Sequence, residues 1–354
     1  MSIKDMYFIL QLYMKEPNKI IIKQGEIKMK RFLALLFTCI LTGALFVGCG
    51  GKATTTDNSA DDGNGGNEKI KIGLTMSSRD QFLSTLETAV KDAAKKQDDA
   101  EIIAFDAEND IQKQLSHISS FVSQDCGAII VNLVNTDTTE EILKAAGDVP
   151  VVFVNRLPNQ PILEESDNSS FVGSDEYEAG QLQAKYLTEY FKDKDDKEIN
   201  YVLFMGTLGL QHTNARTKAV KETLEENGFT LVKQFEDTAE FDRAKAMAKM
   251  QQFIGTGKPF DVVIGNNDEM ALGAIEALKS ANRLDVPVVG IDATANALAA
   301  IEAEEMACSV FQDAGGQGSG AFDFAYKMAQ GEKVDKYGWI PFKIVSLDNL
   351  ADFK

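Results

Sequence analysis

The stretch IGNNDEMALGA (Ile264–Ala274) joins the end of an apolar segment to the start of a helix. The apolar segment carries no alternation of polar and apolar residues, which is typical of a parallel strand covered by helices on both faces. Two asparagines, an aspartate and a glutamate follow, and then good helix formers. These polar residues either cap the helix or hold a ligand, because ligands of parallel sheets lie at the carboxyl ends of the strands.

The same strand-then-helix pattern repeats along most of the chain. Short apolar runs predict strands at 70–76, 101–105, 128–133, 149–155, 200–206, 261–266, 286–292 and 308–312. Amphipathic stretches predict helices at 81–96, 176–191, 213–227, 243–254, 269–281 and 315–330. This alternation predicts an α/β fold with doubly wound parallel sheets. The units are too many for one small sheet, so we expect two such domains.

Composition and charge exclude several classes of function. The chain has 354 residues and a formal net charge of −18, which argues against nucleic acid as a partner. His117 and His212 are the only histidines, so a site of several histidine ligands for a metal is excluded. Cys126 and Cys308 lie among apolar residues, and we expect two buried thiols without a bridge between them.

The beginning of the chain has the pattern of an export signal. Lys30 and Arg31 precede an uncharged stretch at 32–47, and LFVGC (Leu45–Cys49) resembles a bacterial lipobox, in which the cysteine receives a lipid. We expect residues 1–48 to be a signal peptide, with Met29 as an alternative start, and 49–68 to be a flexible tether. The protein would then be anchored by lipid alone to the outer face of the bacterial cytoplasmic membrane. A transmembrane anchor over the same apolar run is the alternative.

Polar side chains follow nearly every predicted strand. Amides and carboxylates can pair with neighbouring hydroxyl groups of a sugar, although each of them could also be a helix cap. Two phenylalanines with polar neighbours offer flat apolar faces for a sugar ring. The candidates at the strand ends are Asp80, Phe82, Asn132, Asn155, Arg156, Asn267, Asp292 and Gln312, and Phe241 supplies the second ring.

From about Lys69 onward the chain resembles the bacterial sugar-binding proteins of ABC importers. The resemblance rests on GLTMSSRDQF, AIIVNLVN, VPVVFVNRLP, NNDEMALGAIEAL, VPVVGIDA and DNLADFK, and it is nearest to the galactose/glucose-binding branch. It implies a type I periplasmic binding protein with two domains, 69–174 plus 313–341 and 175–312 plus 342–354, joined by three crossings. It also implies a monomer that binds a monosaccharide, needs no cofactor, is no enzyme, and delivers its ligand to the permease subunits.

The resemblance assigns roles to individual residues. It implies that the sugar is bound by Asp80, Phe82, Asn132, Arg216, Phe241, Asn267, Asp292 and Gln312, and by Arg156 as in ribose binders. The galactose/glucose branch has a histidine in place of Leu210 and an aspartate in place of His212. His212 can still contact a hydroxyl, whereas Leu210 cannot. Lysines and a missing glycine in 192–200 argue against the calcium loop of that branch.

Alternative functions remain open at this point. D-glucose or D-galactose is favoured, and Leu210 keeps a pentose or a 6-deoxy sugar as competitors. Service to a chemoreceptor or another membrane sensor is the alternative role for the same binding protein. A secreted enzyme on an α/β scaffold is less favoured, because no nucleophile motif is present. The segment GGQGSGA (315–321) matches a dinucleotide fingerprint, but it lies near the end of the chain, where that motif is not expected.

Overall fold

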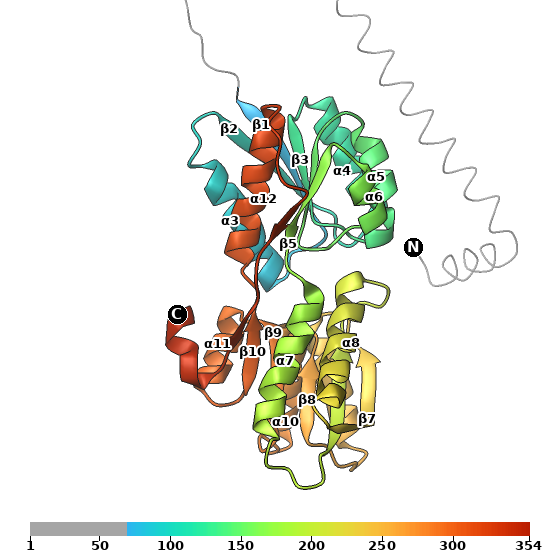
Figure 1. Cartoon of the computed structure of the whole chain (residues 1–354), viewed down its shortest axis with the longest axis vertical. Helices are drawn as coiled ribbons and strands as arrows, with labels where there is room; N and C mark the ends of the chain where they lie inside the picture. Colours follow the sequence, from blue (N-terminus) through green and yellow to red (C-terminus); the bar gives the residue numbers. More distant parts are fainter. Residues whose placement is uncertain (1–68) are drawn as a thin grey trace, which may run out of the picture. The chain divides into compact units, whose positions relative to one another are not determined.

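The computed structural model describes residues 69–354, which form two α/β lobes (Figure 1). The predicted signal peptide at 1–48, Cys49 and the tether at 49–68 lie outside the described residues. Among residues 69–354, no helix has both the length and the apolar character needed to span a bilayer. The expectation of two doubly wound sheets is confirmed, since each lobe is built around one six-stranded sheet.

The first lobe has the strand order β11-β5-β4-β3-β1-β2, and all its strand pairs are parallel. Its strands are β1 (Ile70–Met76), β2 (Ala100–Asp106), β3 (Ala128–Val131), β4 (Val151–Val154), β5 (Ser169–Gly173) and β11 (Tyr337–Trp339). Its helices are α3 (Gln81–Ala94), α4 (Ile111–Ser123), α5 (Thr139–Ala146), α6 (Gln160–Glu165) and α12 (Ala314–Ala329), with a 3₁₀ turn η1 (Thr136–Thr138).

Alternate residues of the central strands fill two separate cores. Ile130 of β3 packs in the core under α3 and α12, while its neighbours Ile129 and Val131 pack in the core under α4 and α5. Both faces of the sheet are therefore buried, which explains the continuous apolar runs in the sequence. Figure 1 shows α12, from near the end of the chain, beside α3. The segment GGQGSGA lies in the first half of α12, where Gly318 faces the backbone of α3.

The second lobe repeats this order as β12-β10-β9-β8-β6-β7. Its strands are β6 (Glu198–Met205), β7 (Thr230–Thr238), β8 (Val262–Gly265), β9 (Val288–Asp292), β10 (Cys308–Phe311) and β12 (Lys343–Val345). Its helices are α7 (Glu176–Tyr190), α8 (Gln211–Glu226), α9 (Arg243–Ile254), α10 (Asp268–Ser280) and α11 (Ala295–Glu302), followed by the 3₁₀ segment η2 (Leu347–Phe353). We expected a wholly parallel sheet, but the edge strand β12 runs antiparallel to β10.

The chain passes between the two sheets three times: after β5, after β10, and between β11 and β12. We keep the lobe boundaries 69–174 plus 313–341 and 175–312 plus 342–354 as a proposal, because α7 packs on strands of the second sheet and α12 on strands of the first. Cys126 and Cys308 are both free and buried, as expected from their apolar neighbours.

Candidate ligand-binding cleft

Asp80 brings a carboxylate to the carboxyl end of β1 and also caps the helix that follows. One of its oxygens accepts a hydrogen bond from the Leu83 backbone N–H at 2.7 Å, which places the side chain at the N-terminus of α3. Burial raises the pKa of Asp80, while the hydrogen bond from Leu83 and the charge of Arg156 oppose this rise. Asp80 can therefore cap α3 and still bind a ligand, because the cap uses only one of its two carboxylate oxygens.

Arg156 follows β4 and is held in place by backbone carbonyls. Its Nη1 donates to the carbonyls of Leu133 at 2.7 Å and Val134 at 3.2 Å. Burial lowers the pKa of Arg156 to about 10, with the charge of Asp80 acting in the opposite direction. The guanidinium is still a cation at neutral pH, so it presents donors with a fixed geometry.

Asn132 lies behind the cleft wall and does not line the cleft. Its Oδ1 accepts hydrogen bonds from the Ser77 N–H at 3.2 Å and from the Ser77 hydroxyl at 2.6 Å. Its Nδ2 donates to the carbonyl of Val154 and to Oδ1 of Asn155, each at 3.2 Å. The amide is fully buried and its hydrogen bonds are made within the protein. It therefore orients Asn155, which does line the cleft.

Arg216 is the centre of a buried polar network in the second lobe. Its Nε donates to Glu176 at 2.6 Å, its Nη1 to the carbonyl of Asn266 at 2.8 Å, and its Nη2 to Oε1 of Gln312 at 3.1 Å. Gln312 completes the network by donating to Glu176 at 3.3 Å. The resemblance had assigned no role to Glu176, and its place behind Arg216 gives no signal in the sequence.

His212 and Phe241 lie against one another, with ring centroids 5.2 Å apart and an angle of 18° between the planes. His212 is on α8, and Phe241 follows β7 with a positive φ of 61°. Gly206 makes room for the phenyl ring, because a Cβ at that position would overlap Phe241. Burial and the charges of Arg156 and Arg216 lower the pKa of His212 well below its usual value, so the ring is neutral at neutral pH.

Asn267 and Asp292 come from the ends of neighbouring strands β8 and β9. Asn267, not Asp268, caps α10: its Oδ1 accepts from the Met270 N–H at 3.0 Å. The Asp268 carboxylate instead links the segment after β9 to β10, by accepting from the Thr294 N–H at 2.8 Å and from the Ser309 hydroxyl at 2.7 Å.

The cleft collects nine of the ten side chains predicted from the sequence, with Asn132 as the exception. They come from both lobes, and Leu83 and Asn155 complete the lining. Asn155 was a strand-end candidate to which the resemblance assigned no role, and it lines the cleft beside Arg156. The cavity between these side chains has a volume of only about 40 Å³. That is room for roughly three water molecules, so a sugar-sized ligand requires the cleft to widen.

The lining defines what the cleft can do chemically. Carboxylates, guanidinium groups, side-chain amides and a neutral imidazole offer both donors and acceptors, and Phe82 and Phe241 add two apolar rings. Such a set pairs with several hydroxyl groups of one ring and holds an apolar ring face. The lining contains no serine, cysteine or lysine that could act as a nucleophile.

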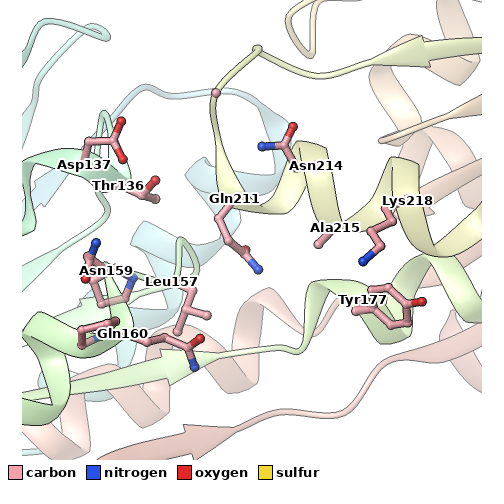
Figure 2. Close-up of a pocket in the computed structure, with 13 residues that line it drawn as sticks. Thr136, Asp137, Leu157, Asn159, Gln160, Tyr177, Gln211, Asn214, Ala215 and Lys218 are labelled. Carbon is pink, nitrogen blue, oxygen red and sulfur yellow. The ribbon is translucent and has the colours of Figure 1, made fainter.

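A larger pocket of about 540 Å³ lies elsewhere between loops of the two lobes (Figure 2). In Figure 2, Thr136, Asp137 and Asn159 form one side, and Gln211 and Asn214 of α8 form the other. None of the ten predicted residues lines this pocket. The narrower cleft, and not this pocket, holds nine of the ten predicted side chains.

Leu210 does not line the cleft, contrary to the position that the resemblance suggested for it. It occupies the N-cap position of α8, where its side chain makes no hydrogen bond, and it lines a neighbouring chamber. The loop at 192–197 is a charged surface segment, in which Lys194 pairs with Asp196 at 3.0 Å.

Comparisons with known proteins agree with this architecture. Residues 72–333 match the family model of the periplasmic binding protein domain. A putative rhizopine-binding protein of Rhizobium meliloti is 41% identical over 292 residues, which cover 80% of this chain and 92% of that protein. The D-galactose/methyl-galactoside binding periplasmic protein MglB of Haemophilus influenzae is 31% identical, with 80% of this chain and 91% of that protein covered.

A solved structure gives a similar result. The solute binding protein of an ABC transporter from Bacillus halodurans, with bound myo-inositol, matches with a TM-score of 0.74 and 35% identity. The match covers 81% of this chain and 97% of that structure. With the paired sheets, the three crossings and the match over most of its length, the chain belongs to the periplasmic binding protein family.

Proposed function

We propose that the protein is an extracytoplasmic solute-binding lipoprotein that binds a monosaccharide-sized, polyhydroxylated ring and delivers it to an ABC importer. The observation that carries this proposal is the cleft itself: charged and amide groups from both lobes converge on a narrow space that two phenyl rings also line. Solute-binding relatives named for galactose, ribose and xylitol support a hydroxylated ligand. We assign the protein no catalytic activity and no cofactor.

In this proposal each side chain has a stated task. Asp80, Asp292 and His212 pair with ring hydroxyls, and the amides of Asn267 and Gln312 assist them. Arg156 and Arg216 donate to ring or hydroxyl oxygens, and Phe82 and Phe241 contact the apolar ring faces. Asn132 acts behind the wall, where its hydrogen bonds hold Asn155 in position.

The favoured ring is a hexose, D-glucose or D-galactose, on the resemblance to the galactose/glucose branch. A cyclitol is the second candidate, because the 35%-identical structure holds myo-inositol. Pentoses and 6-deoxy sugars remain competitors, although the position of Leu210 outside the cleft removes the specific reason for preferring them.

The test is a thermal-shift screen followed by titration calorimetry. The ligands are glucose, galactose, xylose, fucose, ribose and myo-inositol, with maltose-sized oligosaccharides as the size control. We expect a single-site complex with one of the six-membered rings and no turnover of the ligand. Binding by none of these rings, or chemical conversion of one of them, would contradict the proposal.

The lipid anchor is the second part of the proposal, and it rests on LFVGC and the basic and apolar residues before it. We expect wild-type protein to partition with membranes and the Cys49→Ala variant to be released or to stay unprocessed. Mass spectrometry of the mature N-terminus measures the lipid directly. Wild-type protein that is freely soluble with an unmodified N-terminus would contradict it.

The partners of the protein are the permease subunits of the importer, and we propose that the protein acts as a monomer. A chemoreceptor or another sensor is the alternative outlet for the same ligand-bound form. ATP hydrolysis by the reconstituted importer, with and without the loaded binding protein, separates these outlets, because a pure sensor protein would not stimulate it.

A further inference from the structure

Asp292 lines the cleft, yet no residue in the described range 69–354 donates a hydrogen bond to its carboxylate. Nη1 of Arg216 lies 3.9 Å from it, which is beyond hydrogen-bond distance. Asp80 and Asn267, by contrast, are each held by a helix-capping hydrogen bond. The direction of the Asp292 side chain is therefore set by the backbone at the end of β9.

That backbone has an unusual conformation at two successive residues. The φ angle is 120° at Asp292 and 50° at Ala293. Residues that carry a Cβ rarely adopt positive φ, because the side chain then crowds the backbone. Such a conformation persists only where the surrounding structure holds it in place.

Two buried side chains, Asp268 and Ser309, hold this turn, and we call them the clamp. The Ala293 N–H donates to the Ser309 hydroxyl oxygen at 2.9 Å. The Thr294 N–H donates to one oxygen of Asp268 at 2.8 Å, and the Ser309 hydroxyl donates to the other at 2.7 Å. Both clamp residues are 0% exposed and neither lines the cleft, so they can affect a ligand only through other residues.

The clamp is anchored on regular elements of the second lobe. Asp268 is the first residue of α10, where the helix N-terminus favours a carboxylate, and Ser309 lies within β10. Gly290, which is paired with Ser309 in the sheet, leaves space for the carboxylate, because a Cβ there would lie 2.3 Å from Asp268 Oδ1. The turn after β9 is thus fixed to α10 and β10 together.

We propose that Asp268 and Ser309 are positioning residues for the ligand: they hold the turn at positive φ and thereby direct the Asp292 carboxylate into the cleft. This inference rests on the proposed function, because Asp292 must bind the ligand. Without the Ser309 hydroxyl, the Ala293 N–H and one Asp268 oxygen lose their partner. The turn can then relax toward negative φ, which rotates the Asp292 carboxylate away from the ligand hydroxyl.

The first experiment is a double-mutant cycle, measured by titration calorimetry with the best-binding ring of the screen. It compares the wild type, Ser309→Ala, Asp292→Ala and the double variant. We expect Ser309→Ala to bind about tenfold more weakly, as for the loss of one hydrogen bond. In the Asp292→Ala background the same change should alter affinity by less than about twofold, because no carboxylate is left to position.

The matched control is Ser169→Ala in the first lobe. Ser169 is a strand serine that is only 2% exposed, and its hydroxyl has no hydrogen-bond partner among the described residues, so this variant should bind as the wild type does. Wild-type affinity in Ser309→Ala, or the same loss in both backgrounds, would overturn the inference and leave the proposed function intact. Failure of every ring to bind the wild type would overturn the proposed function, and the inference with it.

The second experiment tests the backbone conformation by rescue. Glycine adopts positive φ without the steric cost, so a weakened clamp should still hold the turn when Ala293 is glycine. We expect Ala293→Gly to restore at least about threefold of the affinity that Ser309→Ala loses. Ala297→Gly in the following helix α11 is the control and should restore nothing. No recovery in a folded Ala293→Gly/Ser309→Ala protein would overturn the inference. If Ser309→Ala does not fold, Ser309→Cys replaces it in both experiments, because the thiol fills the space but is a weak acceptor.

Discussion

At the scale of single residues, Arg216 shows how a buried cation is kept available for a ligand. Glu176, Gln312 and the carbonyl of Asn266 use three of its nitrogens, and Nη1 also lies 3.9 Å from Asp292. Both partners of the Arg216–Glu176 pair are almost fully buried, so the loss of either would leave an uncompensated charge. The pair therefore positions the guanidinium, while Asp292 remains free to bind a hydroxyl.

Asp292→Ala is the residue-scale prediction for the ligand. Asp292 is 6% exposed and lines the cleft, so its removal leaves a ligand hydroxyl without a partner in a dry site. We expect a loss of about 2–4 kcal/mol of binding free energy by titration calorimetry. Asp285→Ala, at an exposed surface position, is the control and should bind as the wild type does. Full affinity in Asp292→Ala would place the ligand elsewhere.

Asp268 gives a pH-dependent prediction about stability. Burial raises the pKa of Asp268 to about 7, against about 3.8 when the chain is unfolded. The folded protein thus holds a proton that the unfolded chain releases, and this stabilisation is lost as the pH rises through about 7. Between pH 5 and pH 8 the free energy of unfolding should fall by roughly 2–3 kcal/mol through this group.

Denaturant unfolding of the wild type and of Asp268→Asn at both pH values measures this contribution. The difference between the two proteins reports on Asp268 and on its coupling to Asp292, because the charge of Asp268 helps to raise the pKa of Asp292. The variant should gain stability relative to the wild type as the pH rises. Parallel pH profiles of the two proteins would contradict the assignment.

At the scale of the elements, close helix packing fixes where the ligand residues lie. Gly180 of α7 faces the backbone of α8, where an added Cβ would lie 2.6 Å from the Arg216 carbonyl and 2.9 Å from the Val220 nitrogen. Backbone atoms cannot move aside as a flexible side chain can. The distance between α7 and α8 therefore sets the position of both His212 and Arg216.

Gly180→Ala should separate α7 from α8 and disturb the site from outside it. Alanine stabilises a helix by about 1 kcal/mol relative to glycine. We nevertheless expect Gly180→Ala to lose about 1–3 kcal/mol of stability, which would show that the steric overlap outweighs this gain. Ligand affinity should fall as well, because Arg216 moves with α8. Gly320→Ala in α12 meets only a Val172 methyl at 3.2 Å and is the matched control, which should be nearly neutral. Thermal unfolding of both variants decides the matter, and an unharmed Gly180→Ala would refute the packing argument.

At the scale of the whole described chain, two sheets of the same strand order are linked by three crossings. Each sheet brings the ends of its strands to the cleft, and the lining comes from both lobes. A ligand that contacts both sets of residues favours whichever arrangement of the lobes lets all of them bind.

Hinge motion is the prediction at this scale. Because the cavity of the cleft measures only about 40 Å³, the cleft must widen before a sugar ring can enter and then close on it. Small-angle scattering of the protein with and without saturating ligand should show a smaller radius of gyration in the complex. A protein that binds its ligand with an unchanged radius would count against hinge closure. Asp292→Ala at the same ligand concentration is the control, since it should remain uncompacted.

The sequence determined the elements whose signal is local. The six predicted helices begin and end within two residues of the observed ones. Amphipathic spacing and helix caps such as Asp80 and Asn267 involve residues that are close in the sequence, so the sequence alone can reveal them. Strands β5, β7, β11 and β12 were not predicted. Strands β7, β11 and β12 lie at sheet edges, where partial exposure weakens the apolar pattern. Strand β5 is interior and buried, but its sequence SSFVG has only two apolar side chains and so shows no apolar run.

Some residues of the candidate site could likewise be predicted from the sequence, and others only from the tertiary structure. Residues directly after strands, such as Arg156 and Asp292, could be named from the sequence, because parallel strands bring their carboxyl ends to one edge of a sheet. Only the tertiary structure decided that Asn132 lies behind the wall, that Glu176 holds Arg216, and that Leu210 lines a chamber beside the cleft. These outcomes depend on which side chains meet across long separations in the chain, such as Glu176 and Gln312, and on the space that remains between them. Local propensity carries no information on either.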